Sequence, residues 1–218
     1  MELTASGLRT DQLEWIAGRV EAYSEHCNNR CRSVVDCLGV FSADKIPSRV
    51  TVEKHLARLK SRSGRNSLVF FIANTDPSKK AGSHWVAFVV FASHPTAVEY
   101  FDSFGFALDF YSELHISCLR LGYFRSKSMI RYVNTQALQC DSTSVCGHYC
   151  VIFLVMCART QSGLAAVRAI RQLGRGDCVS RDRRVLQFVN RLQERSPCLC
   201  FQAPSCRSVQ CCCARIPQ

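Results

Sequence analysis

The sequence lacks any apolar run long enough to cross a bilayer. Its longest run, residues 150–158, is about half the ~18–20 residues that a membrane-spanning helix needs. The sequence also lacks the basic and apolar segments of a secretory signal, since residues 1–4 read Met-Glu-Leu-Thr. From these absences we expect an intracellular protein that is neither secreted nor bound to a membrane.

Negative charge and lysine are both scarce. The chain has 17 acidic residues against 28 basic ones, a formal net charge of +11, and 22 of the basic residues are arginine. A charge of this size favours polyanionic partners, and the planar guanidinium can bond two phosphate oxygens at once. DNA is therefore an expected partner, and the alternative is a basic surface that serves only solubility.

Cysteine, in contrast, is abundant. The chain has 15 cysteines, an odd number, and it is too large to need disulfides for a stable core. In a reducing compartment we expect most of them to be free thiols that behave as small buried apolar residues. At least one of them is a candidate for chemistry.

The length of 218 residues and the apolar content of 47% predict one globular domain, residues 1–197, followed by a loose cysteine-rich tail, residues 198–218. Hydrophobic periodicity predicts its elements in order. They are a helix from Thr10 or Asp11 to Tyr23, a short strand or turn in 39–47, a helix within 50–65, strands 67–73, 84–92 and 98–101, a helix 108–121, a strand 129–133, and helices 146–158, 164–173 and 181–194. Because the strands are apolar on both faces, we expect a central sheet covered by helices.

Cys146 and His84 are the first candidates for catalysis. Cys146 stands where a polar loop meets an apolar helix, and the free N–H groups and dipole of a helix start lower the pKa of a thiol. His84 begins a strand, from which its side chain can project into a cleft. A thiolate beside a histidine base is a nucleophile, whereas a buried core cysteine and a structural histidine are the plainer alternatives.

Asp102 and Gln139 complete the set. Asp102 ends the strand that follows the His84 strand, so a hairpin would bring its carboxylate to the imidazole and fix the tautomer. Gln139 lies seven residues before Cys146, where its amide can donate to an oxyanion together with the backbone N–H of Cys146. Taken singly, Asp102 could be a turn residue and Gln139 a solvated loop residue.

The order His84, Asp102, Gln139, Cys146 now resembles the adenovirus-type cysteine proteases (the adenain family), which include enzymes of Maverick/Polinton transposons and other DNA viruses. The resemblance rests on His84-Trp85, on Phe-Asp-Ser-Phe-Gly-Phe at 101–106 and on Gln-x6-Cys-Gly at 139–147. It extends over roughly residues 38–197. The SUMO-specific proteases share the same catalytic order.

The resemblance implies an α+β fold with a central mixed, mostly antiparallel sheet flanked by helices. It also implies a cysteine endopeptidase with the catalytic cysteine at the start of a buried helix. His84, Asp102 and Cys146 would form the triad, Gln139 the oxyanion hole, and Trp85 a wall of the substrate groove. Expected substrates are virion precursor proteins cut beside glycine during maturation, in the host nucleus and in the virion, by a monomer that needs no metal or cofactor for its chemistry.

Two positions depart from the family pattern. The usual glutamate is replaced by Asp102, as in the SUMO proteases. The cysteine that holds the activating viral peptide falls at Ser128 here, which puts that mode of activation in doubt. DNA remains the expected activator, through two basic stretches. The residues expected to bind nucleic acid are Arg49, Lys54, Arg58, Lys60, Arg62, Arg65, Arg183 and Arg184.

Three other functions stay open from the sequence. A SUMO- or ubiquitin-like deconjugating protease would share the catalytic order and differ in substrate. A DNA-binding virion protein with an inactive protease fold would share the basic surface. Zinc binding by the cysteine-rich tail is a weaker alternative, because its spacing has no regular C-x2-C pair and it contains no histidine.

Overall fold

A computed structural model describes residues 7–26, 34–63, 66–124, 129–174 and 177–194. Outside the described residues lie Arg65, Ser128 and the expected tail at 198–218. The predicted end of the domain at residue 197 also lies outside them. The helices are α1 (Thr10–His26), α2 (Arg49–Ser63), α3 (Ser112–Arg120), α4 (Cys146–Thr160), α5 (Gly163–Gln172) and α6 (Cys178–Glu194), with short 3-10 turns η1 (Ala43–Lys45) and η2 (Leu108–Phe110). The strands are β1 (Val34–Phe41), β2 (Ser67–Asn74), β3 (Trp85–Phe91), β4 (Ala97–Phe101) and β5 (Met129–Tyr132).

The five strands form one mixed sheet in sequence order, β1-β2-β3-β4-β5. The central pairs β2–β3 and β3–β4 are antiparallel, while both outer pairs, β1–β2 and β4–β5, are parallel. The predicted α+β class with a mixed sheet is therefore confirmed. Parallel outer pairs need crossover connections, and α2 and α3 supply them.

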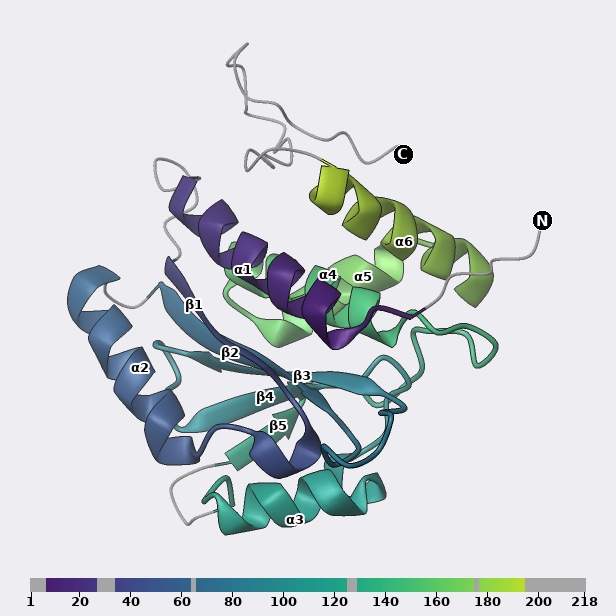
Figure 1. The fold of residues 1–218 in the computed structure, drawn as a ribbon. Helices are drawn as coiled ribbons and strands as arrows, with labels where there is room; N and C mark the ends of the chain where they lie inside the picture. The colour runs from purple at the N-terminus through teal and green to yellow at the C-terminus, as the bar shows by residue number, and fades with distance from the viewer. Residues whose placement is uncertain (1–6, 27–33, 64–65, 125–128, 175–176, 195–218) are drawn as a thin grey trace.

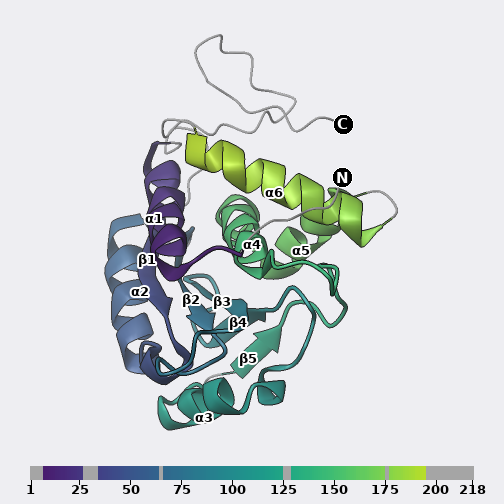
Figure 2. The same cartoon turned by 45° about the vertical axis from the view of Figure 1, so that its right-hand side comes forward.

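Helices cover both faces of the sheet, as the apolar strands predicted (Figure 1, Figure 2). Alternate residues of β2 point to opposite faces. Phe70 belongs to the core cluster that includes residues of α1, α4, α5 and α6, whereas Phe71 belongs to the cluster that includes residues of α2 and α3. The whole length of α4 up to Ala158 is buried. The sheet and α4 thus form the rigid body on which the candidate site lies.

Two predicted elements differ in detail from the structure. The first strand begins at Val34 rather than near Gly39, and η1 follows it. Gly39 has φ 119° within a register shift between Cys37 and Val40, so the regular apolar alternation that marks a strand is interrupted there. The predicted helix 108–121 is divided into η2 and α3 at Tyr111, whose φ and ψ are −104° and 86°.

No single helix among the described residues is long and apolar enough to span a membrane. Only α4 and α5 taken together pass a test of length and composition, and they meet at a bend of 120°.

Candidate active site

Cys146 is the first residue of α4, as predicted, and it is buried with 8% of its surface exposed. The following Gly147 is tightly packed, because a Cβ there would come within 3.3 Å of side-chain atoms of Leu13 and Leu8. The start of α4 is therefore pressed against the N-terminal segment. Cys150 and Cys157, on the same helix, are fully buried free thiols, which confirms their place in the core.

His84 and Asp102 are brought together by strand register. His84 precedes β3, Asp102 follows β4, and the antiparallel pair Ala87–Phe101 sets their alignment. Continuing that register places Asp102 opposite Val86, so His84 lies diagonally across on the same face. The imidazole Nε2 is 2.8 Å from Asp102 Oδ1, and both side chains are buried. The predicted contact between histidine and carboxylate is thus present.

The carboxylate of Asp102 is held in place by further donors. The backbone N–H of Phe104 donates to Oδ1 at 2.8 Å, and the Tyr111 hydroxyl donates to Oδ2 at 2.7 Å. The rings of Phe104 and Tyr111 also stack on the His84 imidazole, with centroids 4.9 Å and 5.6 Å away. Neither aromatic residue was assigned a role from the sequence. Tyr111 had no local signal, whereas Phe104 is part of the motif that contains Asp102.

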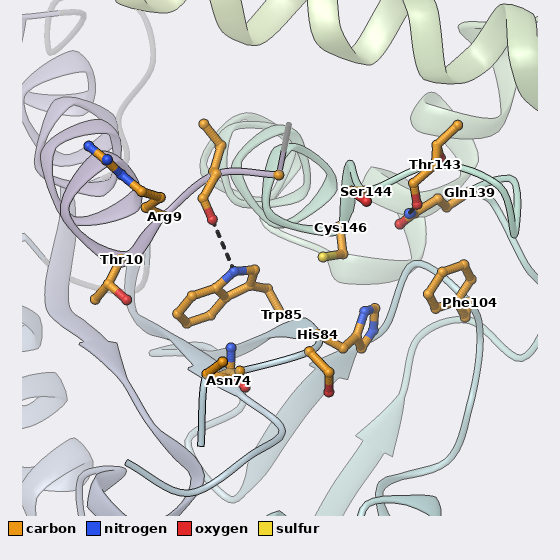
Figure 3. A pocket seen from close by; sticks show the side chains of 15 residues that line it. Arg9, Thr10, Asn74, His84, Trp85, Phe104, Gln139, Thr143, Ser144 and Cys146 are labelled. Atoms are coloured by element: carbon orange, nitrogen blue, oxygen red, sulfur yellow. Dashed lines mark hydrogen bonds between the residues drawn. The ribbon is translucent and has the colours of Figure 1, made fainter. Parts of the chain in front are cut away.

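The environment of His84 favours its charged form. Burial alone would lower the pKa, but hydrogen bonds to Asp102 and Cys146, and the negative charge of both groups, raise the pKa of His84 to about 9. Since Nε2 is bonded to Asp102, Nδ1 is the ring nitrogen left for the sulfur. Figure 3 shows the Cys146 side chain projecting from its helix toward the His84 ring.

His148, two residues after the cysteine, differs from His84 in its surroundings. It is buried with 3% exposure, and burial lowers the pKa of His148 to about 4. Its Nδ1 has no hydrogen-bond partner within the described chain. His148 is therefore a neutral core residue at physiological pH.

Gln139 lines the same pocket as His84 and Cys146, and both ends of its side-chain amide are hydrogen-bonded. Its Oε1 accepts a hydrogen bond from the Ser103 hydroxyl at 2.8 Å, and its Nε2 donates to the Thr143 carbonyl oxygen at 2.6 Å. The backbone carbonyl of Ser103 accepts from the N–H groups of Leu138 and Gln139. The loop before Cys146 is therefore attached to the turn that follows Asp102, and Ser103 is a further contact that sequence reasoning missed.

The expectation that most cysteines are free thiols is wrong for Cys140 and Cys178. They form a disulfide across 38 residues of sequence, with their Cα atoms 5.2 Å apart. Cys140 directly follows Gln139, and Cys178 begins α6. The bond could not be foreseen from spacing, because the loop and α6 meet only in the folded chain.

A groove of about 570 Å³ joins these residues to the N-terminal segment (Figure 3). Trp85 lies along it, as expected for a wall of the groove, and its indole N–H donates to the Leu8 carbonyl oxygen at 3.2 Å. A second hollow of about 320 Å³ shares Thr10, Asn74 and Trp85 with the first. The two hollows thus adjoin at Trp85, and the second contains Lys45 and Lys80.

The residues expected to bind DNA separate into three groups. The prediction that Arg49 binds DNA has to be corrected. Arg49 is 4% exposed, pairs with Glu53 at 2.9 Å and donates to the Pro95 carbonyl oxygen. Its guanidinium is therefore not available to phosphate. Arg58 is half-exposed and shares Asp36 with His55. The others within the described ranges lie on α2 and α6, and they are Lys54, Lys60, Arg62, Arg183 and Arg184.

Within the described ranges no group of three or more histidine, cysteine or acidic side chains is arranged to hold a metal ion. The cysteine-rich tail, to which the zinc alternative applied, is outside those ranges.

Comparison with known proteins gives one family match. The family model of the adenovirus endoprotease matches residues 63–173, just over half of the chain. This stretch begins at the end of α2 and contains all four candidate residues, His84, Asp102, Gln139 and Cys146. No curated protein matches the sequence.

Solved structures similar to this chain include three proteases or effectors. A Chlamydia trachomatis effector protein bound to ubiquitin has 17% identity, covers 89% of this chain and 83% of its own, and has a TM-score of 0.40. An ASFV protease has 17% identity, coverage of 74% and 62%, and a TM-score of 0.42. A de-sumoylating protease has 9% identity, coverage of 86% and 82%, and a TM-score of 0.43. At these scores the likenesses carry no argument about substrate.

Proposed function

For a chain that belongs to the adenovirus endoprotease family, and is therefore a cysteine peptidase, we propose that Cys146 is the nucleophile and His84 its base. Asp102 orients the imidazole, and Gln139 donates to the oxyanion. The observation that carries the proposal is the position of His84, whose Nε2 is bonded to Asp102, whose ring faces the Cys146 side chain, and whose pKa is raised to about 9.

The chemistry follows from that arrangement. His84 takes the proton of Cys146, and the thiolate attacks the scissile carbonyl carbon to form a tetrahedral oxyanion. The imidazolium then returns the proton to the leaving amine, which departs and leaves a thioester on Cys146. His84 next removes a proton from water, the resulting hydroxide attacks the thioester, and Cys146 leaves as the new carboxylic acid is released.

The amide of Gln139 suits the oxyanion role because it has two hydrogens on Nε2. One is held by the Thr143 carbonyl oxygen at 2.6 Å, which leaves the second as a donor to the substrate. The backbone N–H of Cys146, at the start of α4, supplies the other donor. Removing one such donor typically costs about 3 kcal/mol of transition-state stabilisation.

We propose that the substrates are virion precursor proteins, cut beside glycine during maturation. Family membership supports this class of substrate, and the groove beside Trp85 is a surface along which an extended peptide can lie. Because maturation of a DNA virus takes place around its genome, we propose the host nucleus and the virion as its location.

Cleavage assays on two classes of substrate test this function. Purified protein is mixed with a panel of glycine-containing peptides and, separately, with ubiquitin and SUMO carrying a reporter at the carboxyl terminus, each alongside Cys146→Ala. We expect internal peptide cleavage that the variant lacks. Cleavage of the ubiquitin or SUMO reporters alone would reassign the enzyme to deconjugation, and cleavage by Cys146→Ala would remove the proposed nucleophile.

We also propose that DNA binds this protein and stimulates it, without the participation of Arg49. The basic residues of α2 and those of α6 lie on opposite sides of the sheet, so they would make separate contacts (Figure 1). Neutralising phosphates releases counterions, so affinity should fall steeply with salt and depend little on sequence.

Fluorescence anisotropy with a random duplex at two salt concentrations tests DNA binding. The double variants Lys54→Glu/Lys60→Glu and Arg183→Glu/Arg184→Glu separate the two helices, and Arg49→Lys is the matched control. We expect micromolar or tighter binding at low salt that one double variant weakens and the control retains. No binding at low salt would reject the proposal and leave the catalytic assignment intact.

A further inference from the structure

Asp182 is a fully buried carboxylate on α6, with no exposed surface. The Cys140 N–H donates to its Oδ2 at 3.2 Å, and the Thr143 hydroxyl donates to the same oxygen at 2.6 Å. The Tyr149 hydroxyl lies 2.7 Å from Oδ1 and shares its hydrogen with the Leu138 carbonyl oxygen at 2.9 Å. A buried carboxylate is costly unless such donors satisfy it, so the donors around Asp182 are held firmly.

Those donors belong to the two segments that the reaction must hold together. Cys140 and Thr143 are the ends of a turn, closed by a bond from the Thr143 N–H to the Cys140 carbonyl oxygen at 3.2 Å. Tyr149 lies on α4, three residues after Cys146. Asp182 therefore fixes the turn before the nucleophile relative to the helix that carries the nucleophile.

The same turn determines where the Gln139 amide points. The Gln139 Nε2 donates to the Thr143 carbonyl oxygen, and Asp182 holds the hydroxyl of that same Thr143. A shift of Thr143 would therefore rotate the amide away from Cys146. In Figure 3, Gln139 and Thr143 lie side by side at the edge of the pocket that Cys146 also lines.

We propose that Asp182 is a positioning residue for the oxyanion hole, acting through Thr143 on Gln139. The inference rests on the proposed roles of Cys146 and Gln139. Two other groups near the start of α6 support the loop: Arg181 donates to the Leu138 carbonyl oxygen at 2.6 Å, and Cys178 forms the disulfide with Cys140. Asp182 is distinct from both because its carboxylate bonds to the Thr143 side chain.

The test compares two reactions of one thiol. Hydrolysis of a peptide needs the oxyanion hole, whereas alkylation of Cys146 by iodoacetamide needs only the thiolate. In Asp182→Asn, one carboxylate oxygen becomes an amide that cannot accept. We expect kcat per titrated active site to fall about 10- to 100-fold, because the Gln139 amide would be misplaced but still present as a donor. KM and the alkylation rate should stay within about twofold of the parent.

Two further variants make the result specific. Asp177→Asn alters an exposed carboxylate of the same helix start, which bonds to the Ser180 N–H at 2.6 Å, and it should leave kcat unchanged. Thr143→Val removes the hydroxyl that Asp182 accepts while keeping the carbonyl, so it should lower kcat as Asp182→Asn does. It also serves as the test if Asp182→Asn does not fold.

The outcomes separate the inference from the function beneath it. Unchanged kcat in both Asp182→Asn and Thr143→Val would overturn the positioning role. An alkylation rate that falls in step with kcat would also overturn it, because the variants would then act on the Cys146–His84 pair. Turnover by Cys146→Ala in the same assay would instead contradict the proposed function itself.

Discussion

The two walls of the groove are built in different ways. The wall that holds His84 and Asp102 consists of the ends of two neighbouring strands, β3 and β4, and its geometry follows from their register. The wall that holds Gln139 is a loop, and it is fixed by contacts to Ser103 and to the distant helix α6. Strand register makes the first wall rigid by itself, whereas the second depends on how a late element of the chain docks.

The largest effect on activity should come from removing His84, at the centre of the wall formed by the strand ends. His84→Ala removes the group that takes and returns the proton, so we expect kcat/KM to fall by about 10⁴ or more. His148→Gln is the matched histidine control and should keep the activity of the parent, with a loss of stability only. Comparable losses in the two variants, measured as turnover per folded molecule, would contradict the assignment of the base.

Asp102→Asn should have the next largest effect. The amide would favour the wrong imidazole tautomer, and a loss of about 10²–10⁴ in kcat is expected from a triad of this kind. Tyr111→Phe removes one hydroxyl from the same carboxylate, 2.7 Å away, and should cost less than about tenfold. A loss below about fivefold in Asp102→Asn would show that Asp102 serves the turn and that another group orients His84.

The pH profile should report the raised pKa of His84. The imidazolium is the acid that protonates the leaving amine, so kcat/KM should hold through neutral pH and fall about tenfold per unit above pH 9. The same shift, upward from 6.5, contributes stability that is full below about pH 6.5 and is lost as pH rises through 9. Stopped-time assays and thermal unfolding from pH 6 to pH 10.5 measure both, and a basic limb near pH 7 would argue against the raised pKa.

Gly105 joins the two walls, and Gly105→Ala should cost about 1–3 kcal/mol of stability and roughly tenfold in activity. Its φ is 75°, and a Cβ there would lie 2.6 Å from the Gln136 backbone nitrogen. Gly18 on α1 has nothing within 4 Å, so Gly18→Ala should stabilise by about 0.5–1 kcal/mol. Denaturant unfolding measures the stability of both variants. Equal changes in the two would show that a side chain at position 105 does not strain the turn after Asp102.

The smallest effect on activity should come from the disulfide. Cys178→Ala opens the bond to Cys140, so we expect a loss of about 2–4 kcal/mol in stability and less than fivefold in kcat. Cys118→Ala, at a buried free thiol, is the control. Reductant should lower the unfolding midpoint of the parent and of Cys118→Ala, and leave Cys178→Ala unchanged. A midpoint insensitive to reductant in all three would mean that the bond does not form.

The contrast between the walls also explains what the sequence could predict. His84 and Asp102 could be paired from the sequence because adjacent strands of a hairpin meet at their ends, and Cys146 stood at a visible change from polar loop to apolar helix. Gln139 was found by its distance from Cys146. Its supports were not, since Ser103 and the disulfide involve residues far apart in the chain.

Charge in the sequence was the least reliable guide to which side chains are exposed. Arg49 was counted with the basic surface, although it is buried against Glu53 and Pro95. Asp182 was assigned no role from the sequence. It lies three and seven residues before Val185 and Val189, on the apolar stripe of its own helix, and a carboxylate in that stripe is a sign of burial that the sequence did contain.

The central claim is that Cys146, and no other cysteine, is the nucleophile. The direct measurement is labelling of the native protein with a peptide vinyl sulfone ending in glycine, followed by mass mapping of every cysteine-containing fragment. We expect one adduct, at Cys146, formed in proportion to the loss of activity and absent in His84→Ala. An adduct at another cysteine that tracks the loss of activity, with Cys146 unmodified, would contradict the account.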